Sequence, residues 1–262
     1  MRGEPMGKKA LVAVSFGTTH EDALKAISQT EVRLQDEKPD YAFFRAFTSR
    51  MVIERLRKKG VFVPSATEVF EKLLSQGFTE VICQPTHIIS GAEYEKLRDE
   101  AQKISPKFIS LRLGAPLLSQ ESDYARCCKI ITEAMPPLLQ DEALVLMGHG
   151  TGHFANAAYC QLENTFRAQG HERVYVGTVE GFPTIKYVLD RLKKHDIKAV
   201  HLRPFMLVAG EHAVKDLAGE DDSWNTVLLR EGFKTYITLK GLGEEPAIQE
   251  LFVQHLNAAI KL

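Results

Sequence analysis

The sequence contains an internal repeat, and no other feature limits the fold as strongly. Residues 10–20 align with residues 143–153, and six of the eleven positions are identical. A second alignment, shifted by 119 residues, pairs Pro85 with Pro204 at the ends of two strand-length segments. The two alignments differ by fourteen residues because the first half carries an extra helix near residues 50–59. An internal duplication explains this agreement, so we expect two lobes built to one plan.

Strand-length apolar runs alternate with helical patterns in both halves. In the first half we expect strands at residues 10–14, 41–47 and 81–84, and helices at residues 21–35, 51–59 and 67–76. Alternation at these lengths indicates parallel sheets covered by helices. The sequence therefore predicts an α/β fold with two similar doubly wound parallel-sheet lobes.

The lobe boundaries follow from the repeat and from local composition. We expect an N-terminal lobe over residues 1–138 and a C-terminal lobe over residues 139–240, with the pair Pro136 and Pro137 at the junction. Residues 241–262 are expected to form a C-terminal helix that packs back on the first lobe. Ligands of open parallel sheets bind beyond the carboxyl ends of the strands. Two such lobes facing each other would form a binding cleft there.

Composition and missing motifs narrow the function classes. The formal net charge of −1 gives no sign of nucleic-acid binding, and no apolar run is long enough for a membrane span. The four cysteines form no C-x-x-C pair, which favours a reducing, cytoplasmic location. The sequence leaves open whether an export signal was removed and whether the chain forms a homo-oligomer. P-loop, G-x-G-x-x-G and G-x-S-x-G motifs are absent, so we expect no nucleotide cofactor.

Polar side chains follow three strands of the second half at positions where the first half differs. His149 stands where the first half has Phe16, directly after an apolar strand and between two glycines. Glu180 follows the next strand, and His212, which aligns with Glu93, lies in the loop after the third. Because the carboxyl ends of parallel strands meet at one edge, we expect His149, Glu180 and His212 to lie together.

This trio of side chains suits a divalent metal ion. Two imidazoles and one carboxylate form a recurrent site for first-row metals that keeps open positions. Imidazole and carboxylate can also accept protons near neutral pH. We therefore predict that His149, Glu180 and His212 are both the metal ligands and the catalytic residues. The alternative for each histidine is a polar loop position, and for Glu180 it is the capping of the following helix.

Six short motifs, in order along the chain, resemble those of the anaerobic sirohydrochlorin cobaltochelatases. They are Val-Ser-Phe-Gly-Thr-Thr at residues 14–19, Pro-Thr-His-Ile-Ile-Ser-Gly at residues 85–91, Gly-His-Gly at residues 148–150, Phe-Met-Leu-Val-Ala-Gly-Glu-His at residues 205–212, Asp-Asp-Ser-Trp at residues 221–224 and Gly-Leu-Gly-Glu at residues 241–244. The similarity runs from about residue 8 to residue 256. That family belongs to the class II chelatases, which include the ferrochelatases.

The resemblance implies a bilobal chelatase fold and a lyase of cobalamin (vitamin B12) biosynthesis. The implied reaction inserts Co²⁺ into the tetrapyrrole sirohydrochlorin, releases two protons and needs no ATP. The partners are then sirohydrochlorin and the divalent metal ion, both as substrates. The resemblance implies metal ligation by two histidines and a glutamate, which match His149, His212 and Glu180 by position. Fe²⁺ as a second accepted metal, and haem binding, stay open.

Sirohydrochlorin carries eight carboxylates, so cationic side chains should line part of its site. Arg45, Arg50 and Arg203 are candidates, with ordinary surface charge as the alternative. His87 follows a strand of the first half and is a candidate for the same site, with a structural role as its alternative. Two other functions stay open: a non-catalytic carrier of tetrapyrrole or metal, and a non-haem iron oxygenase using the same kind of ligand set.

Overall fold

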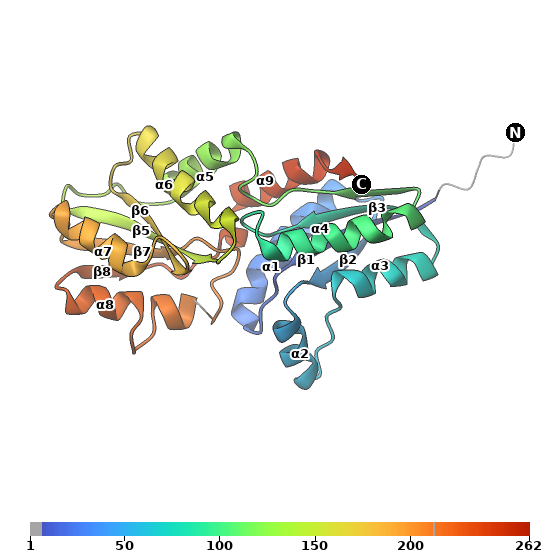
Figure 1. The fold of residues 1–262 in the computed structure, drawn as a ribbon, viewed down its shortest axis with the longest axis horizontal. Helices are drawn as coiled ribbons and strands as arrows, with labels where there is room; N and C mark the ends of the chain where they lie inside the picture. Colours follow the sequence, from blue (N-terminus) through green and yellow to red (C-terminus); the bar gives the residue numbers. More distant parts are fainter. Residues whose placement is uncertain (1–6, 212) are drawn as a thin grey trace, which may run out of the picture. The chain divides into compact units, whose positions relative to one another are not determined.

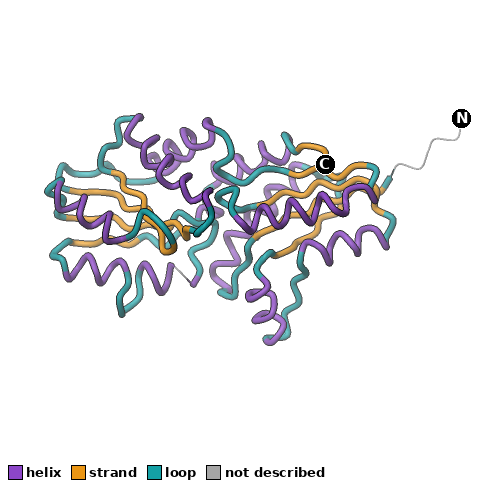
Figure 2. The backbone as a smooth tube through the Cα atoms, in the orientation of Figure 1, coloured by secondary structure: helices purple, strands orange, loops and turns teal. Residues whose placement is uncertain are grey.

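The computed structural model describes residues 7–211 and 213–262. This part of the chain forms two compact units. Unit 1 comprises residues 7–19, Ile27–Ser119 and Gln249–Leu262, and unit 2 comprises His20–Ala26 and Gln120–Ile248. Strands and helices alternate along both units (Figures 1 and 2). In the described residues, no helix combines the length and apolarity that crossing a membrane requires.

Unit 1 contains one five-stranded sheet in the order β2-β1-β3-β4-β9. Its strands are β1 (Lys8–Ser15), β2 (Ala42–Phe47), β3 (Phe78–Pro85), β4 (Ser110–Leu113) and β9 (Ile260–Lys261). The first four strands of this list are parallel, as predicted, and β9 is antiparallel to β4 at the sheet edge. From Ala10 to Ser15 every residue of β1 is buried, because helices cover a central parallel strand on both faces.

The helices of unit 1 pack along this sheet (Figure 1). They are α1 (Glu21–Glu37), α2 (Arg50–Lys58), α3 (Ala66–Ser75), α4 (Ala92–Ile104), which continues into the 3₁₀ turn Ser105–Lys107, and α9 (Pro246–Asn257). The first residues of both α1 and α9 belong to unit 2. Ser65 and Glu68 form a capping box that starts α3. The segment after α9 is tied to β4, since Arg112 Nε donates to the carbonyl oxygen of Ala259 at 2.9 Å.

Unit 2 contains a four-stranded, fully parallel sheet in the order β6-β5-β7-β8. Its strands are β5 (Glu142–Gly150), β6 (Val174–Glu180), β7 (Ala199–Pro204) and β8 (Lys234–Ile237). Its helices are α5 (Glu121–Glu133), α6 (Ala157–Ala168), α7 (Ile185–Lys194) and α8 (Trp224–Arg230), with short helical turns at Phe154–Asn156, Ala213–Leu217 and Leu242–Glu244.

The two units divide after Ser119, whereas the sequence analysis placed the lobe boundary after residue 138. The difference is helix α5, which packs against α6 of unit 2. Cys128 Sγ of α5 lies 3.8 Å from the carbonyl oxygen of Leu162 in α6. A proline pair marks a change in backbone direction, but it does not tell which sheet the preceding helix covers.

Equivalent strands occupy equivalent places in the two sheets. Each sheet runs second, first, third, fourth in chain order. Backbone hydrogen bonds of unit 1 recur in unit 2 between residues that the sequence alignment pairs. Thr86 N donates to Val14 O at 2.8 Å, and Phe205 N donates to Met147 O at 2.8 Å. Leu117 N to His87 O is matched by Leu242 N to Met206 O, each at 2.9 Å. The predicted duplication of the fold is therefore confirmed at the level of single backbone bonds.

Candidate metal site

His149 is the penultimate residue of β5, and the glycines around it are sterically required. A Cβ at position 148 would overlap the ring of Tyr159. Gly150 has φ +80°, and a Cβ there would overlap the carbonyl oxygen of Glu180. These two positions let β5 end in a close approach to β6, with the imidazole of His149 half-buried at the carboxyl edge of the sheet.

The tautomer of His149 follows from its backbone contact. Its Nδ1 lies 2.9 Å from the carbonyl oxygen of Gly150. A carbonyl oxygen only accepts, so Nδ1 carries the proton and donates. In the neutral imidazole the lone pair is then on Nε2, which is the atom that a metal ion would bind.

Glu180 is the last residue of β6, the strand that pairs with β5 on one side. The register of the two parallel strands pairs Gly148 with Thr178 and Gly150 with Glu180. The Glu180 side chain is exposed at the same edge of the sheet. Helix α7 is capped instead by Thr184, whose hydroxyl oxygen accepts from Tyr187 N at 3.3 Å. The residue whose side chain caps α7 is thus Thr184 and not Glu180.

His212, the third predicted ligand, lies outside the described residues. The strand that precedes its loop, β7, pairs with β5 on the side opposite β6, and Met147 is the register partner of Pro204. Within residues 7–211 and 213–262, no group of three histidine, cysteine or acidic side chains could hold a metal ion. The structure thus brings His149 and Glu180 to adjacent strand ends, and the three-ligand set stays a prediction.

The carboxyl edge of unit 1 carries buried hydroxyl groups. Ser15 Oγ and Thr86 Oγ1 are 2.8 Å apart, and both residues are almost fully buried. Thr48 Oγ1 lies 3.3 Å from Nε2 of His87. Burial lowers the pKa of His87 to about 4, so this imidazole is neutral at physiological pH. Its Nδ1 is buried and has no hydrogen-bond partner in the described part of the chain.

Two of the three candidate arginines have internal partners. Arg45 Nε donates to Glu31 Oε1 at 2.8 Å. Arg203 is only 2% exposed, and its Nη2 donates to Glu245 Oε1 at 2.5 Å. Arg203 is therefore unsuited to substrate carboxylates, because its charge is neutralised inside unit 2. Arg50, by contrast, is exposed in the first turn of α2.

Two side chains that support this edge give no functional signal in the sequence. Asn156 and Tyr159 lie one helical turn apart at the start of α6 and contact the end of β5 and the loops that follow β5 and β6. Neither residue type suggests a functional site in this sequence context. The available signal was indirect: a glycine at position 148, inside a buried strand, indicates that a large group packs closely there.

Solved structures with this fold define the class of protein. SirB from Bacillus subtilis with Fe³⁺ superposes with a TM-score of 0.63 at 15% identity, covering 95% of this chain and 94% of that one. CbiX, the terminal enzyme for biosynthesis of siroheme in denitrifying bacteria, superposes with a TM-score of 0.59 at 16% identity, covering 96% and 100%. The chain therefore has the chelatase fold.

Sequence relatives narrow the class to one family. The profile of the cobalt chelatase (CbiK) family matches residues 9–261. The sirohydrochlorin cobaltochelatase of Salmonella typhimurium is 43% identical over 258 residues, which is 97% of each chain. The sirohydrochlorin cobaltochelatase CbiKC of Nitratidesulfovibrio vulgaris is 32% identical, over 98% of this chain and 92% of that one. The chain belongs to the cobalt chelatase family.

Proposed function

We propose that this chain is a sirohydrochlorin cobaltochelatase. It inserts Co²⁺ into sirohydrochlorin, and two protons leave the pyrrole nitrogens as two metal–nitrogen bonds replace two N–H bonds. The observation that carries the proposal is the 43% identity to the Salmonella enzyme over nearly the whole of both chains. The strand-end pair His149 and Glu180 supplies the chemistry that the reaction needs.

The metal ion is a substrate, so its ligands must bind it and then release it. Nε2 of His149 is the neutral donor nitrogen, since Nδ1 is engaged by the Gly150 carbonyl. Glu180 adds one negative charge and an exposed oxygen that can pass protons to solvent. His212 completes the set in this proposal. Two imidazoles and one carboxylate leave coordination positions open for the incoming pyrrole nitrogens.

Arg50 is the side chain that we propose for the substrate carboxylates. It lies directly after Ser49, the residue that caps α2, and Ser49 N donates to Phe16 O at the end of β1. A cation in the first turn of a helix is unfavourable, because the N-terminus of a helix carries a partial positive charge. Local rules of this kind are broken most often at functional sites. A substrate with eight carboxylates would be attracted both by the Arg50 guanidinium and by the partial positive charge of the helix N-terminus.

Co²⁺ is the proposed physiological metal, and Fe²⁺ is proposed as a second ion that the same ligands can accept. No nucleotide is required in this mechanism, because metal exchange is driven by the stability of the metallated macrocycle. The thiols of all four cysteines are free. This supports a reducing, cytoplasmic location.

The decisive experiment mixes the purified chain with sirohydrochlorin and Co²⁺, Fe²⁺, Ni²⁺ or Zn²⁺ under anaerobic conditions. Metal insertion is followed by visible absorption of the tetrapyrrole. The proposal expects many turnovers per chain without ATP, fastest with Co²⁺. A signal that stops at one equivalent of product per chain would identify a carrier instead. A requirement for oxygen would identify an oxygenase.

A further inference from the structure

The residues at the start of α6 contact two loops, each of which directly follows a strand that carries a predicted metal ligand. One of these loops follows β5 and His149, and the other follows β6 and Glu180. Asn156 and Tyr159 make the contacts from positions three residues apart, so they lie on one face of the helix start. Both side chains belong to unit 2, as do the two loops.

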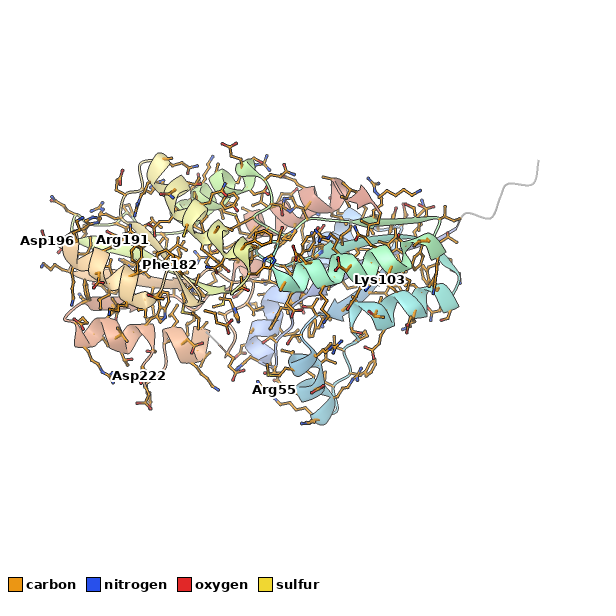
Figure 3. The ribbon with its side chains drawn as sticks, viewed as in Figure 1. Arg55, Lys103, Phe182, Arg191, Asp196 and Asp222 are labelled. Atoms are coloured by element: carbon orange, nitrogen blue, oxygen red, sulfur yellow. The ribbon has the colours of Figure 1, made fainter. Side chains whose placement is uncertain are left out.

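Asn156 joins the two loops through the two ends of its side-chain amide. Its Oδ1 accepts from Thr151 N at 3.0 Å, in the loop after His149. Its Nδ2 donates to the carbonyl oxygen of Phe182, in the loop after Glu180. Phe182 lies in this loop (Figure 3), and its ring is 4.8 Å from that of Tyr187 in α7. The Asn156 amide therefore links the two loops directly, beside the apolar contact of Phe182.

Tyr159 supports His149 from inside the unit. The residue is 2% exposed, and its ring fills the space that a side chain at position 148 would need. The backbone N–H groups of His149 and Gly150 lie near its phenol oxygen and oppose the rise in the pKa of this phenol. Burial has the larger effect and raises that pKa to about 12, so the phenol stays neutral.

We infer that Asn156 and Tyr159 are positioning residues that set the distance and orientation of His149 relative to Glu180. The inference rests on the proposed function, in which His149 and Glu180 bind the metal ion. Neither Asn156 nor Tyr159 is a proposed metal ligand. They act through the backbone of the ligand loops, in the way that outer partners orient metal ligands elsewhere.

The variants Asn156→Asp and Tyr159→Phe test this role with little change in volume. Aspartate keeps the acceptor for Thr151 N but cannot donate to the Phe182 carbonyl. Phenylalanine keeps the ring under Gly148 but removes the phenol oxygen. Matched controls come from the same unit: Asn225→Asp, where Oδ1 accepts from Thr235 Oγ1 at 2.6 Å, and Tyr175→Phe, where the phenol lies 2.6 Å from Nδ1 of His195.

Three quantities are measured for each variant: Co²⁺ affinity of the full chain by visible spectroscopy, the KM for sirohydrochlorin, and the melting temperature. Outer partners of metal ligands change affinity or activity by about 10- to 100-fold. We expect Co²⁺ affinity to fall by about that factor in Asn156→Asp and Tyr159→Phe, with the KM for sirohydrochlorin unchanged. The controls should lose comparable melting temperature and keep their Co²⁺ affinity.

Unchanged Co²⁺ affinity in both test variants would overturn the inference. So would a loss of affinity in the controls that tracks melting temperature in the same way, since the effect would then be general stability. The variant His149→Ala separates this inference from the proposed function. If His149→Ala binds Co²⁺ as the unchanged chain does, the proposed site itself is wrong. If His149→Ala loses Co²⁺ and the test variants do not, only the positioning role is wrong.

Discussion

Burial of the His87 imidazole lowers its pKa from 6.5 to about 4, so its protonation opposes folding. As pH falls below 6.5, the unfolded chain takes up this proton before the folded chain does. The folded state should therefore lose up to about 3 kcal/mol between these two pH values from this residue. In His87→Gln the drop in the free energy of unfolding between about pH 7 and pH 4.5 should shrink, as measured by urea titration. The control His171→Gln should keep the full drop, and an equal drop in His87→Gln would contradict the prediction.

His149 should matter for the metal and not for the tetrapyrrole. We expect His149→Ala to lower cobalt insertion by at least about 100-fold, the upper range for groups that act on a bound metal. The Kd for sirohydrochlorin should stay within about twofold. In the double variant His149→Ala with Glu180→Gln, the loss of insertion activity should be smaller than the two single losses combined, because the effects of groups that act as one unit are not additive. Insertion rates and tetrapyrrole binding are measured separately, and near-normal insertion by His149→Ala would contradict the assignment.

Single residues were predictable where the repeat gave a comparison. His149 could be singled out because it stands where the first half has Phe16, and Glu180 because it follows the next strand, which the structure pairs with β5. Arg203 could not be judged, because its partner Glu245 lies 42 residues away in sequence and no pattern links them. Asn156 and Tyr159 were missed for the same physical reason: their contacts are tertiary, and a polar or aromatic side chain at a helix start is ordinary.

The element most sensitive to substitution is the junction of β5 and β6. Gly150 combines φ +80° with a backbone so close to Glu180 that a Cβ would overlap its carbonyl oxygen. We expect Gly150→Ala to lower the free energy of unfolding by at least about 2 kcal/mol and to weaken Co²⁺ binding with it. Gly152→Ala is the control, since a Cβ there meets no atom within 4 Å. It should change stability by less than about 0.5 kcal/mol. Equal effects in the two variants would show that the β5–β6 junction is not constrained in this way.

Elements with a long pattern were predictable, and short ones were not. The central strands and their flanking helices appear at the predicted places because parallel buried strands are continuous apolar runs. Strand β9 has two residues and joins the sheet antiparallel to β4, which no periodicity can indicate. Helix α5 was predictable as a helix, but its unit depends on packing against α6.

At the scale of the whole molecule, comparison of the two duplicated units shows that α2 is an extra helix in unit 1. In unit 1, Phe47 N donates to Pro64 O at 2.9 Å across the segment that contains α2. In unit 2 the equivalent bond, Thr178 N to Pro183 O at 2.7 Å, closes over four residues. The same strand ends are thus joined with and without the helix. The connection between these strand ends therefore does not depend on α2. Residues 50–59 carry five cations, of which Arg57 pairs with Glu68 at 2.7 Å and Arg50 is exposed.

Deleting residues 50–61 should leave a folded enzyme that binds its tetrapyrrole more weakly. The deletion leaves four residues between Phe47 and Pro64, the spacing that unit 2 has between Thr178 and Pro183. The KM for sirohydrochlorin should rise about tenfold, the scale of one lost charge-assisted hydrogen bond. Co²⁺ affinity should not change, because the predicted metal ligands all belong to unit 2.

The point variant Arg50→Glu tests whether Arg50 itself, and not another part of α2, binds the substrate carboxylates. It keeps the helix and improves its first turn, so it should be at least as stable as the unchanged chain. If Arg50 binds substrate carboxylates, its KM should rise as much as that of the deletion, and the rise should shrink at high salt. Lys103→Glu, a charge reversal on α4 (Figure 3), is the control and should leave KM unchanged. A normal KM in Arg50→Glu alongside a raised KM in the deletion would move the role to the other cations of α2. Normal KM values in both would remove α2 from substrate recognition.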